Sequence, residues 1–155
     1  MIEPTSNEKT VAYSYHEAEA LRLKIEPMVR QMRQHYQNLR EIARFLEVYR
    51  QKISLLGGYF AWNDMQSVLE MWNKHQRAIK DMMGKLSTHG VVVRDPEQGL
   101  IDIPGRLQDS PIYWCWKPDE SVILFYHSVD EGFAGRKPVP PEIRNVEGTH
   151  HDVEP

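Results

Sequence analysis

The chain has 155 residues, of which 41% are hydrophobic and 26% charged, a composition typical of one globular domain rather than a disordered segment. Its formal net charge of -3 excludes the basic excess that drives binding to phosphate backbones, so we expect no nucleic-acid partner. No apolar run approaches the ~20 residues that cross a bilayer, and the N-terminal residues lack the pattern of a signal peptide. With one cysteine the chain forms no internal disulfide, and we expect a cytoplasmic protein with no membrane partner.

The first long pattern predicts a helix that starts near Ser14. Ser14 and Glu17 have the spacing of a capping box, and Pro27 predicts a break or kink in the helix. Beyond it, two series of mostly apolar residues recur every seven positions: Ile25, Met32, Leu39, Leu46 and Ile53, with Met28, His35, Ile42, Tyr49 and Leu56 beside them. Such a seam is typical of a helix packed along a partner helix. Gly57-Gly58 supplies its C-terminal cap.

A second helix follows, capped by Asn63 or Asp64, with a heptad series of its own: Met65, Trp72, Ile79 and Leu86. The short connection over residues 58–62 predicts an antiparallel helical hairpin. His35 and His75 both fall on the seam. If the turn lies near residue 60 and each helical residue rises about 1.5 Å, His35 and His75 are offset by roughly 15 Å along the helix axis. We therefore expect the two histidines not to meet within one chain.

After Gly90 the pattern becomes extended, with turn residues between short β-branched or aromatic runs. The expected strands are Val91–Val93, Leu100–Ile103, Ile112–Trp116 and Val122–His127, with Thr10–Tyr13 as a possible fifth. The predicted fold is α+β, a long antiparallel helical hairpin packed on a four- to five-stranded antiparallel sheet. Residues 1–137 are expected to form a single domain, and 138–155 a proline-rich extended tail.

Three stretches of the C-terminal half carry a family resemblance: GVVVRDPEQGLIDIP (Gly90–Pro104), YWCWK (Tyr113–Lys117) and YHSVDEGFAGRKP (Tyr126–Pro138). They resemble an uncharacterised prokaryotic family catalogued as domain of unknown function 2203. The opening Tyr13–Leu21 is similar to the start of that family's N-terminal helix. The resemblance covers roughly residues 10 to 138. It implies a shared fold and names no activity, cofactor or ligand.

The strongest candidate site is the end of the last predicted strand and the loop after it. His127, Asp130, Glu131 and Arg136 lie there, and the two glycines of the loop allow the chain to reverse. We hypothesise that His127 and Arg136 face one pocket, which suits a small anionic ligand because arginine offers a bidentate fork. The alternative is structural: Arg136 pairs with Asp130 or Glu131 and holds the loop.

Trp114 and Trp116 alternate on one face of a strand, where they either stack on a flat ligand or pack under the helices as core. Cys115 points to the other face and is expected to be an inert buried thiol, because no basic residue lies next to it in sequence. No group of residues has the spacing of a metal site, and the patterns identify no cofactor.

Together these patterns favour a non-enzymatic ligand- or partner-binding or assembly module. A homodimer is expected because the first helix is longer than the partner that covers it. The alternative is a small enzyme that uses His127 with Asp130 or Glu131, with assistance from a metal. The enzyme gains support if His127, Asp130 and Arg136 line a concave pocket with a further polar group such as Asp102. The binding module gains support if they only hold a flat loop together.

Overall fold

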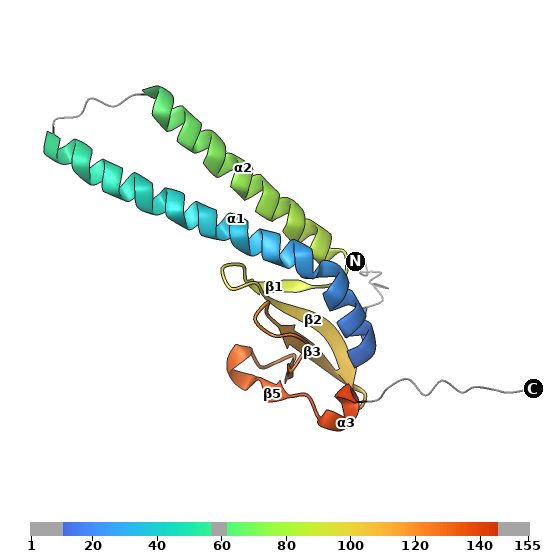
Figure 1. The fold of residues 1–155 in the computed structure, drawn as a ribbon. Coiled ribbons are helices and arrows are strands. Elements are labelled where there is room, and N and C mark those ends of the chain that lie inside the picture. Colours follow the sequence, from blue (N-terminus) through green and yellow to red (C-terminus); the bar gives the residue numbers. More distant parts are fainter. Residues whose placement is uncertain (1–10, 57–61, 146–155) are drawn as a thin grey trace, which may run out of the picture.

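The computed structural model describes residues 11–56 and 62–145, and these form a helical hairpin packed on an antiparallel sheet (Figure 1). The hairpin consists of α1 (Tyr15–Leu56) and α2 (Trp62–Ser87), and it projects well beyond the sheet. The sheet has five strands in the order of the chain: β1 (Val92–Asp95), β2 (Leu100–Leu107), β3 (Ser110–Trp116), β4 (Phe125–Ser128) and β5 (Lys137–Pro138). A 3-10 turn η1 (Phe133–Gly135) and a short helix α3 (Pro141–Arg144) complete the described part. The predicted α+β class is confirmed.

The start of α1 confirms the predicted capping box. The Ser14 amide donates to Glu17 at 3.1 Å, and the Glu17 amide donates to the Ser14 hydroxyl at 3.3 Å. Pro27 does not end the helix, which runs on to Leu56 with its axis bent in the first part (Figure 1). Ion pairs of Glu26 with Arg22 and Arg30, at 2.8 Å each, bridge the turns around the proline. The caps predicted at Gly57-Gly58 and at Asn63 or Asp64 lie outside the described residues and side chains.

The central hairpin of the sheet is longer than the sequence indicated. The sequence predicted a strand that ends at Ile103, but β2 continues through Pro104 and Gly105 to Leu107 and pairs with β3 from Ile101 to Leu107. Proline is tolerated there because β1 pairs with β2 only as far as Asp102, so no ladder bond on that edge needs an amide of Pro104. The two residues of the turn, Gln108 and Asp109, have φ of 49° and 64°, as in a tight hairpin turn.

The fifth strand comes from the C-terminal side rather than from Thr10–Tyr13. Tyr13 makes only an isolated parallel bridge to Gly105, while β5 pairs with β4. The described part of the segment expected to be an extended tail packs against the rest of the chain. Val139 is fully buried in the core, and Pro141 at the first turn of α3 has the φ that a helix start requires.

The main core lies between α1 and one face of the sheet. The side chains buried there belong to one apolar cluster that includes Ile25, Val29, Met32, Ile101, Ile103, Trp114 and Trp116. Gly105 allows this packing, because a Cβ at that position would lie 2.1 Å from Nε1 of Trp114. None of the described helices is long and apolar enough to cross a membrane.

His35 and His75 are in contact, which shows that the predicted 15 Å separation was wrong. Their Nδ1 atoms lie 2.8 Å apart across the hairpin. The sequence estimate assumed that α1 ends and α2 begins at one level. In the structure α1 extends farther from the sheet than the start of α2 (Figure 1), so the two helices do not meet at one level. One ring donates its Nδ1–H to the Nδ1 lone pair of the other, so both Nδ1 atoms have a partner.

This pair predicts a loss of stability in mild acid. Burial, then the charges of His35 and Lys74, lower the pKa of His75 from its usual 6.5. A histidine with a depressed folded-state pKa contributes stability that is complete above the unfolded value and is lost as the pH falls toward the folded one. We expect the thermal midpoint of the wild-type protein to fall more between about pH 7.5 and about pH 5.5 than that of His75→Gln. Equal shifts of the two proteins would contradict this account of the pair.

Candidate functional site

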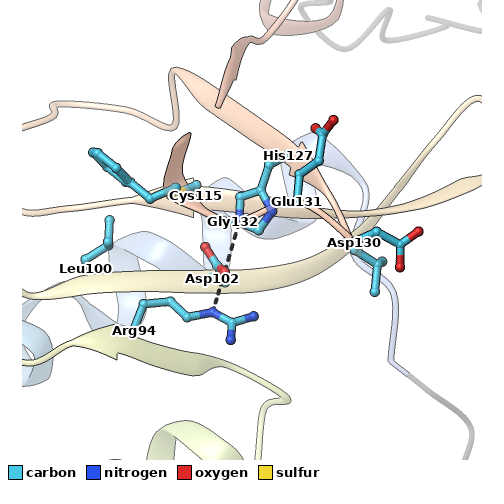
Figure 2. A pocket seen from close by; sticks show the side chains of 10 residues that line it. Arg94, Leu100, Asp102, Cys115, His127, Asp130, Glu131 and Gly132 are labelled. Atoms are coloured by element: carbon cyan, nitrogen blue, oxygen red, sulfur yellow. Dashed lines mark hydrogen bonds and ion pairs between the residues drawn. The ribbon is translucent and has the colours of Figure 1, made fainter. Parts of the chain in front are cut away.

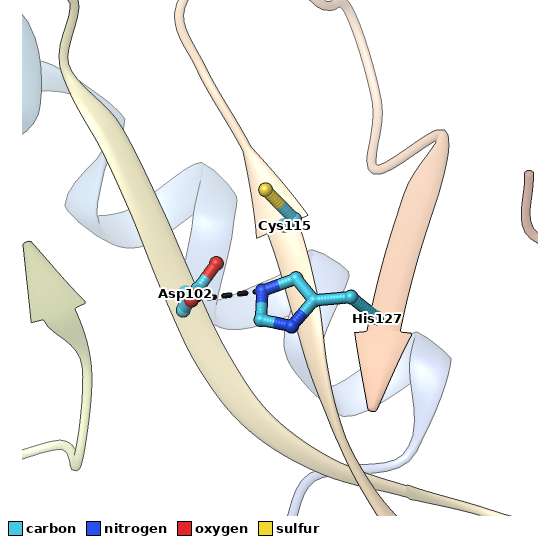
Figure 3. Close-up of side chains that lie close together, drawn as sticks. All are labelled: Asp102, Cys115 and His127. Atoms are coloured by element: carbon cyan, nitrogen blue, oxygen red, sulfur yellow. Dashed lines mark hydrogen bonds and ion pairs between the residues drawn. The ribbon is translucent and has the colours of Figure 1, made fainter. Parts of the chain in front are cut away.

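The site forms on the face of the sheet opposite the apolar core, where three neighbouring strands place polar side chains side by side. Asp102 of β2 is the direct cross-strand partner of Cys115 of β3. His127 of β4 pairs with Tyr113, two residues before Cys115, so all three side chains project from the same face. Figure 3 shows them converging from the three strands. The pleat thus separates this polar group from Trp114 and Trp116, which alternate onto the core face.

The three side chains are almost completely buried: Asp102 and Cys115 are 1% exposed and His127 is 2% exposed. Oδ2 of Asp102 lies 2.7 Å from Nε of Arg94 and 2.9 Å from Nε2 of His127, and these two contacts are drawn as dashed lines in Figure 2. Oδ1 of the same carboxylate is buried and has no hydrogen-bond partner. One oxygen of Asp102 is therefore shared by two cationic or potentially cationic groups, and the other has no hydrogen-bond partner, although the carboxylate also interacts with the neighbouring Cys115 thiol.

Both ring nitrogens of His127 face oxygen atoms. Nδ1 lies 2.9 Å from the carbonyl oxygen of Ser128, which can only accept, so Nδ1 carries a proton and donates it. Nε2 faces the Asp102 carboxylate oxygen at 2.9 Å. A ring lone pair and a carboxylate oxygen repel each other at this distance, so a proton or another positive group must lie between them. The arrangement fixes Nε2 of His127 as the position that receives this positive charge.

Cys115 is an un-ionised thiol in this environment. Burial first, and then the negative charge of Asp102, raise the pKa of Cys115 to about 12, while Arg136 acts in the opposite direction. A thiol is a nucleophile or a metal ligand only as the thiolate. Cys115 therefore contributes sulfur chemistry only if something at the site replaces its proton.

These residues form the floor of a cavity of about 290 Å³, shown in Figure 2. The full lining consists of Arg94, Leu100, Asp102, Cys115, His127, Val129, Asp130, Glu131, Gly132 and Phe133. Asp130 and Glu131 are exposed and lie at the mouth. Of the predicted site residues, the structure thus brings His127, Asp130 and Glu131 to one cavity.

Arg136 lies outside the cavity lining, although it donates to the backbone carbonyl of Cys115 at 3.4 Å. Its guanidinium contacts both carboxylate oxygens of Glu120, at 2.8 and 3.0 Å, and lies over the rings of Phe125 and Phe133. The sequence left open a structural role in which Arg136 pairs with a carboxylate and holds a loop. Arg136 forms such a pair with Glu120 instead of Asp130 or Glu131. Because Arg136 does not line the cavity, Arg94 supplies the guanidinium there, and it contacts Asp102 rather than His127.

Trp114 and Trp116 are both fully buried, and each indole N–H donates to a backbone carbonyl, of Tyr13 and Glu120 respectively. Neither ring has free surface on which a ligand can stack. Of the two possibilities that the sequence left open, stacking on a ligand or packing in the core, both rings have the second.

Sequence reasoning did not identify Arg94 and Cys115 as site residues, and it named Asp102 only as a possible additional polar group. The available signal was Asp102, the charged residue in the apolar run Leu100–Ile103. A lone carboxylate inside an apolar strand needs a partner. Its partners come from β1 and β4, and their register was not determined by the sequence pattern.

Comparison with known proteins gives the family. The family model described as "Uncharacterized conserved protein (DUF2203)" matches residues 12–139, which include every residue of the cavity. The chain belongs to this family. No curated protein and no solved structure showed a significant match. The family description names no activity, so function has to be argued from the site itself.

The environment of Cys115 predicts very slow reaction with thiol reagents. At about pH 8, four units below a pKa of about 12, roughly one thiol in ten thousand is ionised. We expect the native protein to react with a disulfide reagent far more slowly than the same protein unfolded in denaturant, and Cys115→Ser not to react at all. A native rate equal to the denatured rate would show that the thiol is neither buried nor suppressed.

Proposed function

We propose that this member of the family is a non-enzymatic ligand-binding module. Its binding site would be the cavity on the face of β2, β3 and β4 opposite the apolar core. The observation that carries this proposal is the free buried oxygen Oδ1 of Asp102 at the floor of an open cavity. A buried carboxylate oxygen without a partner costs stability, and a bound group that contacts it removes that cost.

The charges at the cavity favour a ligand with positive character. Arg94 and His127 are both engaged with Asp102, and two further carboxylates, Asp130 and Glu131, stand at the mouth. The small anion suggested by the sequence relied on Arg136, whose guanidinium pairs with Glu120 outside the cavity lining. The carboxylates outnumber the arginines of the lining, so a cation is the better match.

Binding is favoured over catalysis because the obvious reactive groups are occupied. Neither ring nitrogen of His127 presents a free lone pair to a substrate, since each faces an oxygen atom within the protein. The Cys115 thiol is un-ionised near neutral pH. A general base must be within hydrogen-bond reach of the proton that it abstracts and free to take it.

The alternative, a small metal-assisted enzyme, has one observation in its favour. His127 and the carboxylates of Asp130 and Glu131 line the same cavity, so several titratable groups lie together at its floor and mouth. In that case Asp130 or Glu131 would be the acid–base group, since both are exposed and His127 is not.

The free buried cysteine is compatible with the reducing cytoplasm, which we propose as the location of the protein.

The cavity is tested by closing its mouth. A Cβ at Gly132 would meet nothing within 4 Å, so Gly132→Trp is expected to place an indole at the mouth without disturbing the fold. We expect native mass spectrometry of protein purified without chelator to show a bound mass on the wild type that is lost from Gly132→Trp.

Gly84→Trp is the matched control, because Gly84 in α2 also has nothing near its Cβ and lies outside this cavity. It should keep the bound mass. The absence of any bound mass from the wild type, or its retention in Gly132→Trp, would contradict the proposed binding site.

We further propose that the module pairs with a second copy through the outer part of the hairpin. Among the described side chains of residues 40–52 and 65–85, none is buried, although the seam is apolar. Leu39 is 9% exposed where the helices meet the sheet, whereas Phe45 is 54% exposed and Val48 52% exposed farther out. A second hairpin packed against this one would complete a four-helix bundle core, the usual solution for such a seam.

The pairing is tested by removing one exposed apolar ring. Phe45→Ser should convert a species of twice 18.2 kDa into the monomer in light scattering, with little change in helix content. Phe133→Ser is the matched control, because Phe133 is similarly exposed at 52% but lies beside the cavity. A wild-type protein that is monomeric at micromolar concentration would rule out the pairing.

A further inference from the structure

The cavity floor carries an oxygen, a sulfur and a nitrogen that are close enough to contact one ion. One ligand atom each of Asp102, Cys115 and His127 lies within 4.8 Å of the other two, and all three residues are buried (Figure 3). Among the described residues this is the one group of three potential metal-binding side chains with such geometry. Strands, rather than loops, hold all three, so their positions are set by the sheet.

We propose that Asp102, Cys115 and His127 bind one divalent transition-metal ion of the zinc class at the floor of the cavity. This inference rests on the proposed function, since the ion would be the cationic ligand, or part of it, that the cavity holds. It assigns a role to the Asp102 carboxylate, whose Oδ1 has no hydrogen-bond partner, and to the only cysteine of the chain.

One pair of ligand atoms already has the spacing of a metal site, and Sγ of Cys115 lies within 4.8 Å of a ligand atom of each of the other two residues. Two ligands at about 2.1 Å from a metal, separated by angles of 90–109°, lie about 3.0–3.4 Å from each other. Nε2 of His127 and Oδ2 of Asp102 are 2.9 Å apart, close to this spacing. The positive group that must lie between them is therefore either a proton or a metal ion placed a little to one side.

The outer contacts are those that metal ligands usually have. A metal-binding histidine commonly donates its other ring N–H to a backbone carbonyl, which fixes the tautomer. Nδ1 of His127 does this with Ser128, at 2.9 Å, and leaves Nε2 toward Asp102. The carboxylate is in turn held by Arg94 at 2.7 Å. These contacts orient the imidazole and the carboxylate before any ion arrives.

The donor set selects the metal. Thiolate and imidazole together suit zinc and its neighbours, whereas magnesium and calcium prefer oxygen ligands only. On binding, the Cys115 thiol and Nε2 of His127 each lose a proton to solvent, and the resulting thiolate and the Asp102 carboxylate balance the two positive charges of the ion. Three protein ligands leave one position of a tetrahedron open to the cavity.

The simpler arrangement is an imidazolium–carboxylate pair, with a proton between His127 and Asp102. It accounts for the 2.9 Å contact, but it gives no hydrogen-bond partner to Oδ1 of Asp102 and leaves Cys115 as a protonated thiol beside the carboxylate. The two arrangements differ in one observable: only the metal converts Cys115 to a thiolate near neutral pH.

Cobalt(II) provides the test, because it replaces zinc and its spectrum reports on bound sulfur. We expect anaerobic titration of the full chain near pH 7.5 to saturate at about one equivalent, with thiolate-to-cobalt charge transfer in the near ultraviolet and release on addition of zinc. Because Cys115 is the only cysteine, this band in the wild-type protein identifies its sulfur without any variant.

Cys115→Ser should lose the charge-transfer band, and Asp102→Asn should weaken cobalt binding at least ~10-fold. Circular dichroism checks that both variants are folded. The double variant His35→Gln/His75→Gln is the matched control, because it removes the other pair of close ring nitrogens and should leave the band unchanged.

Saturation without a thiolate band, or loss of cobalt binding in the His35→Gln/His75→Gln control, would overturn the proposed metal site. An organic mass retained by the wild type and lost from Gly132→Trp, with no cobalt bound, would overturn the metal but leave the proposed binding function. The absence of both would overturn both.

Discussion

Alternation of side chains across the pleat of β2, β3 and β4 is the constraint on which the site depends. Successive residues of a strand point to opposite faces, so Ile101 and Ile103 face α1 while Asp102 faces away. The same rule places Trp114 and Trp116 in the core and Cys115 on the polar face. A shift of one residue in the register of β2 and β3 would bury the carboxylate under the helices. Correct apolar packing on one face therefore assembles the candidate site on the other.

Electrostatics then holds the polar face together. A buried carboxylate is costly unless it is paired, and Asp102 is paired on one oxygen by Arg94 and His127. Removing one partner of a buried pair typically costs 3–5 kcal/mol, because the remaining charge stays buried. Arg136 and Glu120 form a second buried pair nearby, with side-chain exposures of 12% and 8%. This pair ties the connection between β3 and β4 to the segment after η1, and the residues just before η1 line the cavity.

The sequence predicted the architecture well because the fold depends on local signals and periodicity. The capping box at Ser14, the helical seams and the C-terminal family pattern are all visible in the chain, and each corresponds to an observed element or to the matched family. The errors fell where neighbouring strands or helices decide the outcome. Pro104 remains in a strand because of where β1 ends, and His35 meets His75 because the helices are staggered.

The site was only partly predictable for the same reason. His127, Asp130 and Glu131 are close in sequence, so they stood out as a group. Arg94 and Cys115 join them through cross-strand register, which a single sequence does not supply. Arg136 is close to His127 in the chain, yet the buried Glu120 carboxylate and two aromatic rings hold it outside the cavity.

The central claim is that the buried polar face of the sheet is built to hold a ligand. The most direct measurement is a crystal structure of the protein purified without chelator, with diffraction collected on both sides of the zinc absorption edge. The account predicts non-protein density against Oδ1 of Asp102, with an anomalous signal if the group is the proposed metal ion. A cavity that holds only ordered water, with Oδ1 of Asp102 satisfied by a protein donor, would contradict it.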